Sequence, residues 1–200
     1  MKRLTLFLAV ALCLTTAPAA MAQSDMGLKN LGAAVGFVSP ENLDMTFSIG
    51  AFADWGMMAP NIGLETRLDY WGWSETNFGM ETSIRDIALG ARGKYYFETA
   101  NPRVRPFAGA GLALHFITAE VNIPAMPPFP AESYSDTQNK LGLDLGGGLA
   151  TPINPRTDFL AEAWYGIVSD VSQFSLRAGI SYKLGYAAAK APAAPAAKGR

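Results

Sequence analysis

Apolar and polar residues alternate without a break near the end of the chain, over residues 174–184. Strict period two puts successive side chains on opposite faces of a β-strand, so this segment predicts a strand with one apolar face. Its eleven residues exceed the ~5–6 of an ordinary strand and match the ~9–11 that a tilted strand needs to cross a bilayer. The apolar face comprises Phe174, Leu176, Ala178, Ile180, Tyr182 and Leu184.

Seven earlier segments show the same alternation, and turn signals rich in Pro, Asn and Gly separate them. Eight is an even number of strands, as a closed antiparallel meander requires. The fold class that we predict is therefore all-β, an eight-stranded antiparallel up-and-down transmembrane β-barrel. The predicted strands cover residues 30–38, 44–55, 62–71, 84–97, 104–118, 140–149, 157–168 and 174–184.

The connections between the predicted strands differ in length. Those near residues 59–61, 99–103 and 152–156 are short, whereas residues 72–82 and 119–138 form longer segments. The last of these contains four prolines, so we expect an irregular loop and not a paired central strand. With a periplasmic N-terminus, the short connections are periplasmic and the long ones extracellular, which is the usual asymmetry of outer-membrane barrels.

The first 22 residues are typical of a secretory signal peptide. Lys2 and Arg3 precede an unbroken apolar run of nine residues, and Ala20-Met21-Ala22 is a small-x-small cleavage site. The only cysteine, Cys13, lies in the apolar run, so the mature protein is expected to contain no disulfide. Without the two basic residues of this segment, 14 basic residues remain against 17 acidic ones, a net charge of −3.

The remaining chain divides into a barrel domain, residues 23–186, and an Ala/Pro-rich tail, residues 187–200. The tail has no hydrophobic periodicity, so we expect an extended periplasmic segment. The sequence contains no basic patch of the kind that would indicate nucleic-acid binding.

Period two does not by itself tell a lipid-facing barrel from a soluble one. A soluble periplasmic ligand-binding barrel would turn its apolar face inward and remains an alternative. Three features favour the membrane: Gly and Ala on the polar faces, which suit a narrow lumen; aromatic residues near the strand ends, as in interfacial girdles; and the export signal.

Charged residues recur on the polar faces and are expected to point into the lumen. Because desolvated charges need partners, we predict a structural salt-bridge network. A narrow porin-like channel for small solutes is an alternative, although eight strands leave a lumen that side chains fill. The residues are Glu65, Arg67, Asp69, Asp86, Arg92, Lys94, Arg105, Lys140, Asp144, Glu162, Arg177 and Lys183.

The terminal strand carries Arg177-x-Gly179-x-x-Tyr182-x-Leu184, which is similar to the signal that the outer-membrane assembly machinery reads. Over residues 28–186 the chain resembles the small eight-stranded outer-membrane barrels, which include the OmpA transmembrane domain, OmpX and opacity-type porins. The resemblance implies the cell outer membrane as location, with lipid, lipopolysaccharide and the assembly machinery as partners. The tail departs from this pattern, and no peptidoglycan-binding domain follows it.

The sequence offers one candidate for a catalytic base, His115, which is expected to face the lumen. Some eight-stranded barrels modify lipid A, and their His-Ser-Glu deacylases carry a serine two residues after the histidine, where this chain has Ile117. The sequence also lacks a metal-ligand cluster. We therefore expect neither enzyme activity nor a cofactor.

The function that these features indicate is a structural or surface-interaction role in the outer membrane. Recognition is expected in the loops at about residues 72–82 and 119–138, because exposed loops on a rigid scaffold commonly carry binding. The second loop contains Ile123, Met126 and Phe129, which suit contact with a protein partner or with lipopolysaccharide.

Overall fold

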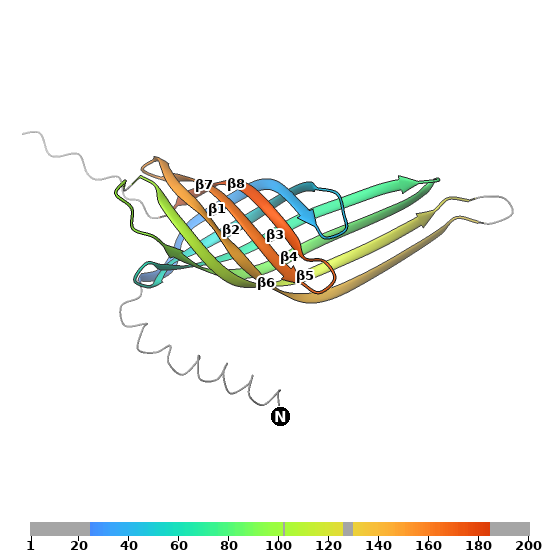
Figure 1. The fold of residues 1–200 in the computed structure, drawn as a ribbon, viewed down its shortest axis with the longest axis horizontal. Coiled ribbons are helices and arrows are strands. Elements are labelled where there is room, and N and C mark those ends of the chain that lie inside the picture. The colour runs from blue at the N-terminus through green and yellow to red at the C-terminus, as the bar shows by residue number, and fades with distance from the viewer. Residues whose placement is uncertain (1–24, 102, 126–129, 185–200) are drawn as a thin grey trace, which may run out of the picture.

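Eight β-strands close into one barrel in the computed structural model, which describes residues 25–101, 103–125 and 130–184 (Figure 1). Neighbouring strands are antiparallel and follow chain order, so the predicted eight-stranded up-and-down barrel is confirmed. The strands are β1 Asp25–Pro40, β2 Thr46–Ala59, β3 Ile62–Asn77, β4 Met80–Tyr96, β5 Arg105–Ile123, β6 Glu132–Asn154, β7 Thr157–Val168 and β8 Gln173–Lys183.

The last strand closes the ring by pairing on both sides. Ala178 of β8 lies opposite Ala161 of β7 and opposite Val35 of β1. Closure leaves the wall without a free edge, so its backbone groups are hydrogen-bonded inside the protein, as a membrane requires.

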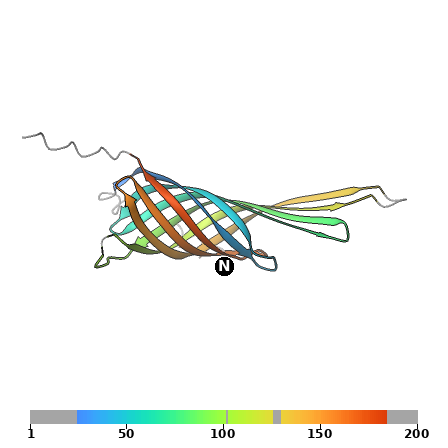
Figure 2. The ribbon, with the colours of Figure 1, turned by 90° about the horizontal axis from the view of Figure 1, so that it is seen from above.

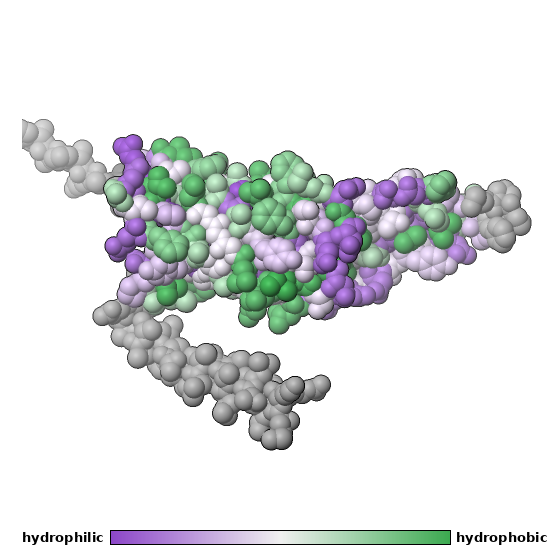
Figure 3. Space-filling model, viewed as in Figure 1, coloured by the Kyte–Doolittle hydropathy of each residue, from purple (hydrophilic) through white to green (hydrophobic). Residues whose placement is uncertain are grey.

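The two faces of the wall point as the alternation predicts. Leu89 and Leu176 on the outer face are each 55 % exposed, whereas Trp164 on the lumen face is 1 % exposed. Figure 3 shows the resulting apolar band on the side of the barrel that faces the viewer, with hydrophilic residues toward the two ends of the barrel. The lumen is tightly filled: a Cβ atom at Gly146 would overlap the Ala163 carbonyl oxygen and the Trp164 ring.

The two predicted long loops are wrong in their extent, because most of their residues belong to strands. β3 and β4 continue to Asn77 and Met80 around a turn formed by Phe78 and Gly79. β5 and β6 continue to Ile123 and Glu132. The prolines break the strand only near the tip: Pro124 and Pro130 lie outside the strands, and Pro127 and Pro128 lie outside the described residues.

These extensions form one sheet beyond the barrel (Figure 2). β4 pairs with β5 as far as Glu81 and Asn122, which joins the two hairpins into four hydrogen-bonded strands. We call residues 73–77, 80–84, 117–123 and 132–139 the projecting sheet.

Both outer strands of the projecting sheet have an unpaired edge within the described part of the chain. β2 pairs with β3 only as far as Ser48 and Trp71, and β7 pairs with β6 only from Gly142 onward. Beyond these points, β3 pairs only with β4, and β6 only with β5.

The turns at the opposite end of the barrel are short, as predicted. Within the described residues they comprise 60–61, 97–101, 103–104 and 155–156. The predicted signal peptide (1–22), Met126, Phe129 and the predicted tail (187–200) lie outside the described residues. Over the described ranges, no helix is long and apolar enough to cross a membrane.

Candidate functional site

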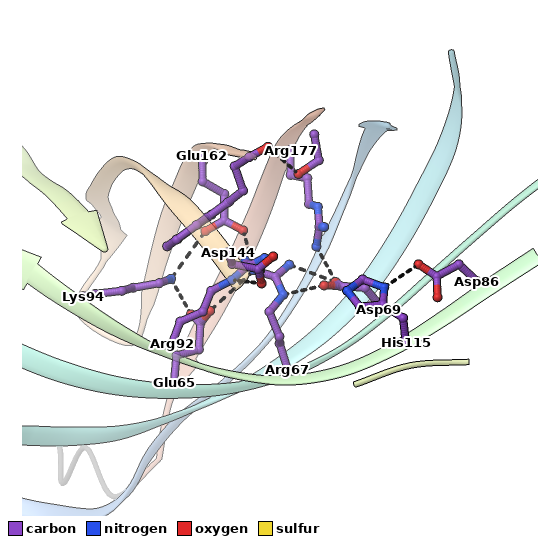
Figure 4. A network of polar contacts seen from close by, with 12 residues as sticks. Glu65, Arg67, Asp69, Asp86, Arg92, Lys94, His115, Asp144, Glu162 and Arg177 are labelled. Atoms are coloured by element: carbon purple, nitrogen blue, oxygen red, sulfur yellow. Dashed lines mark hydrogen bonds and ion pairs between the residues drawn. The ribbon is translucent and has the colours of Figure 1, made fainter. Parts of the chain in front are cut away.

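A cluster of charged side chains fills the middle of the lumen (Figure 4). Its members come from five strands and are all buried, although charged residues are rarely buried unless they are paired. Four are basic and four are acidic, so the cluster has no net charge when all are ionised. They are Glu65, Arg67, Asp69, Arg92, Lys94, Asp144, Glu162 and Arg177.

Arg67 is the hub of this cluster. Its Nε donates to Asp69 Oδ2 at 2.5 Å, and its Nη1 donates to Glu162 Oε1 at 3.2 Å, across the lumen from β3 to β7. Arg177 of β8 donates to the second oxygen of Asp69. Arg67 thus links β3 to β7, and Asp69 links β3 to β8.

Lys94 and Arg92 extend the cluster along β4. Lys94 Nζ lies 2.5 Å from Glu65 Oε2 and 3.4 Å from Glu162 Oε2. Arg92 donates twice to Asp144 Oδ2, from Nη2 at 2.7 Å and from Nε at 2.9 Å. Charge-assisted bonds of this kind are the strong ones in a dry interior, and removal of one partner leaves a costly unpaired charge.

Aromatic side chains close the lumen below the cluster, toward the end of the barrel where β1 begins and β8 ends. Lys94 Nζ lies 4.6 Å from the Phe107 ring centre, and Phe107 packs against Trp164 with ring centres 6.5 Å apart. Phe52 and Leu160 form a buried apolar contact group at this level. Among the described residues, the cavity left above them within the ionic layer is about 20 Å³, room for about one water molecule.

His115 lies on the lumen face, 2 % exposed, where the alternation places it. Its Nδ1 is 2.7 Å from Asp86 Oδ2, so the pair joins β5 to β4. Ile117, two residues later, is also buried. Within the described part of the chain, no group of three or more His, Cys, Asp or Glu residues is arranged to hold a metal ion.

The other expected lumen residues lie at the rims and not in the cluster. Arg105 and Lys183 both bind Asp158, at 2.8 and 2.7 Å. Lys140 binds Asp170 of the β7–β8 turn at 2.9 Å, at the opposite rim. Asp158 was missed by the sequence reasoning, although it precedes Phe159 in a strand whose phase turns it inward.

The four residues of the proposed assembly signal divide between the two faces of β8. Arg177 points into the lumen, whereas Tyr182 and Leu184 lie on the outer face, 46 % and 37 % exposed. Tyr182 lies opposite Leu31 of β1 and opposite Thr157 of β7, and Gly179 lies opposite Ala34. Nothing in this arrangement tests recognition by an assembly machinery, which stays a prediction.

The projecting sheet has two chemically different faces, which follow from its pairing and alternation. The outer face, continuous with the lipid-facing wall, is rich in Ser and Thr. The inner face, continuous with the lumen wall, has an apolar centre on β4 and β5 and acidic residues on β3 and β6. The inner-face residues are Trp73, Glu75, Asn77, Met80, Thr82, Ile84, Ile117, Ala119, Val121, Ile123, Glu132, Tyr134, Asp136 and Gln138.

The projecting sheet is acidic. Residues 73–84 and 117–139 contain five Asp and Glu residues and no Lys or Arg. Glu132 accepts a hydrogen bond of 2.5 Å from the Tyr134 hydroxyl, and this bond raises the pKa of Tyr134 because it favours the protonated phenol. Arg85 and Lys140 adjoin the sheet at its base, and the Arg85 guanidinium lies 3.8 Å from Glu120.

Comparisons with known proteins agree on one architecture. Residues 5–183 match the family model described as the outer membrane protein beta-barrel domain. No curated protein matches the chain.

Three solved structures illustrate the likeness. Neisserial surface protein A is 19 % identical, with a TM-score of 0.62, over 78 % of this chain and 97 % of that one. Ail, the attachment invasion locus protein of Yersinia pestis, is 14 % identical, with a TM-score of 0.51, over 80 % of this chain and 100 % of that one. The N-terminal barrel domain of Pseudomonas aeruginosa OprF is 15 % identical, with a TM-score of 0.51, over 79 % of this chain and 99 % of that one.

Proposed function

Because the chain belongs to the outer membrane protein β-barrel family, we propose that its barrel anchors a recognition surface in the outer membrane and that the projecting sheet is this surface. The family match places the protein in the outer membrane, which removes the soluble periplasmic alternative. A structural or surface-interaction role is consistent with this family.

The observation that carries the proposal is the unpaired edge of β6 from Glu132 to Asn139. An edge strand presents free N–H and C=O groups in a row, and natural proteins normally cover or blunt such edges. An edge that extends past the barrel into the aqueous phase is suited to accept an extended segment of a partner by strand addition. The name of Ail, an attachment protein of the same fold, fits such a role.

The lumen supports an anchoring role for the barrel itself. Ion pairs and aromatic rings occupy the lumen, and the described side chains leave no open path through it. This filling argues against the alternative of a narrow channel. Purified protein in planar bilayers is expected to give no unitary conductance steps. Reproducible steps would favour the channel.

The test of the proposed function is a variant with both hairpins shortened. The pairing of Trp73 with Ile84 and of Thr118 with Thr137 allows Asn-Gly turns to replace residues 74–83 and 119–136 in register. We expect cells that display the intact chain to adhere to surfaces coated with serum or matrix proteins. Cells that display the shortened chain should adhere no better than cells without it.

Retention of the barrel is the control for this experiment. The shortened variant should keep the heat-dependent gel mobility of a folded barrel, because its wall and lumen cluster are untouched. Adhesion by the shortened variant at the level of the intact chain, or no gain from the intact chain, would contradict the proposal.

The ends of the chain and the terminal strand belong to the same proposal. Residues 1–22 direct export, residues 23–186 form the barrel, and residues 187–200 remain in the periplasm as a tail. Arg177, Gly179, Tyr182 and Leu184 serve as the signal for the assembly machinery.

A further inference from the structure

The inner face of the projecting sheet is an apolar surface without a partner among the described residues. Met80 is 41 % exposed and Tyr134 is 59 % exposed, and Ile84, Val121 and Ile123 are half-buried. A sheet with one apolar face normally packs that face against another layer. Exposed apolar patches framed by polar residues commonly mark a binding surface.

The orientation of this apolar face is the reverse of what the barrel below it shows. In the wall, β4 and β5 turn Leu89 and Leu114 outward and Asp86 and His115 inward. Above the wall, the same strands turn Ile84 and Val121 inward, and their outward positions are polar. Lipid accounts for the apolar outer face of the wall, but it does not account for an apolar inner face above the membrane.

Acidic residues border the apolar centre on both sides. Glu75 lies on β3, and Glu132 and Asp136 lie on β6, all on the inner face. The two central strands between them carry only apolar or uncharged inner residues. An occupant must therefore offer apolar side chains along its middle and positive charge along its margins.

Charge decides between the possible occupants. A second copy of the chain would place the three inner-face acidic residues against three others, and the phosphates of a lipid surface would also meet this acidic border. Only a basic occupant would be attracted electrostatically by the acidic border. Resting on the proposed function, we propose that the inner face of the projecting sheet binds a cationic amphipathic segment of a partner protein.

The experiment uses the full barrel in zwitterionic lipid nanodiscs and three fluorescent octapeptides, measured by anisotropy at physiological ionic strength. One alternates Lys and Val, one alternates Lys and Ser, and one alternates Glu and Val. The Lys-Val peptide should bind at least about tenfold more tightly than the Lys-Ser peptide, since four buried Val side chains exceed the ~1.4 kcal/mol that a factor of ten requires. The Glu-Val peptide should not bind.

Matched variants locate the binding to one face. E132Q combined with D136N removes two inner-face charges and should weaken Lys-Val binding about three- to tenfold. E120Q, on the outer face of the same sheet, should leave the affinity for the Lys-Val peptide unchanged. V121S on the inner face should weaken binding, whereas T118S on the outer face should not.

Two results would overturn the inference. Equal binding of the Lys-Val and Lys-Ser peptides would show that only net charge acts. Equal effects of the inner-face and outer-face variants would show that the inner face is not the site. Either result leaves the proposed function standing if the shortened-hairpin variant still loses adhesion, so the two failures are distinguishable.

Discussion

Four of the eight strands of the barrel wall, β3 to β6, continue into the projecting sheet, yet the apolar face changes sides between the two regions. In the wall, the outer face meets lipid and is apolar, and the inner face carries paired charges such as Arg92 and Asp144. In the projecting sheet, the outer face is rich in Ser and Thr, and the apolar residues lie on the inner face. The medium on each side, and not the strand itself, sets which face is apolar.

The largest effect that separates the two regions is expected from the substitution Arg67→Ala. It removes the hub of the buried cluster and leaves Asp69 and Glu162 short of a counter-charge in a dry interior. Breaking a buried pair in this way costs about 3–5 kcal/mol of unfolding free energy. Urea unfolding in lipid vesicles, followed by tryptophan fluorescence, measures the loss.

Arg85→Ala is the matched control, because Arg85 is on the neighbouring strand β4 at the base of the projecting sheet, with its side chain 56 % exposed. Its ion pair with Glu120 is in water, where such pairs contribute about 0–1 kcal/mol. If the two variants unfold at the same urea concentration, the lumen cluster is not the rigid core of the barrel.

The second effect compares two tyrosines, one on the lipid face of the wall and one on the projecting sheet. Tyr182→Asp puts a charge against lipid and should reduce the folded fraction, by a destabilisation of order 1–3 kcal/mol. Tyr134→Asp changes a residue that is exposed to water and should leave folding unchanged. The ratio of heat-modifiable to unfolded protein on gels checks both.

A third variant, Ile180→Asp, separates lipid contact from the proposed assembly signal. Ile180 shares the outer face of β8 with Tyr182 but lies outside the motif. If the motif is read during assembly, Tyr182→Asp should reduce outer-membrane insertion in cells more than Ile180→Asp does. Similar insertion of the two variants in cells would remove the recognition role of Tyr182.

The comparison of wall and projecting sheet also explains what the sequence could predict. The eight strands of the wall were found because lipid on one side enforces a strict alternation, and β7 has the predicted bounds. The lumen position of Arg67 and Glu162 followed from the same phase. The partner of each charge could not be predicted in this way, because pairing across the lumen depends on barrel closure and register. The contact between Arg67 of β3 and Glu162 of β7 illustrates this dependence.

The predicted strand ends at residues 71 and 118 were too early for a related reason. The apolar phase of β5 moves from even positions, such as Leu114 and Phe116, to odd positions, such as Ile117 and Val121. A pattern search that expects one phase takes this reversal for the end of the strand. Gly79, the second residue of the two-residue turn, is the sequence signal that could have located the tip of this hairpin, although the prediction placed a loop over residues 72–82.

A smaller effect is expected at the rim that carries the short turns, where Asp158→Asn removes the shared partner of Arg105 and Lys183. The two cations are partly exposed, so water compensates for part of the loss and the cost should be about 1 kcal/mol. Urea unfolding should therefore place this variant between Arg85→Ala and Arg67→Ala. A loss as large as that of Arg67→Ala would mean that the rim is as dry as the central cluster.

The smallest effect is expected at the tip of the projecting sheet, and its sign is opposite. Phe78 is fully exposed and has a left-handed backbone, with a φ of 51°, and it is followed by Gly79 with a φ of 83°. Two-residue hairpin turns of this shape favour Asn at the first position, and Phe there is strained. Phe78→Asn should therefore stabilise the hairpin by about 0.5–1 kcal/mol and slow hydrogen exchange at Asn77 and Met80, while the unfolding of the barrel stays unchanged. Faster exchange in the variant would mean that the Phe78 ring stabilises the tip through contacts that outweigh its backbone strain.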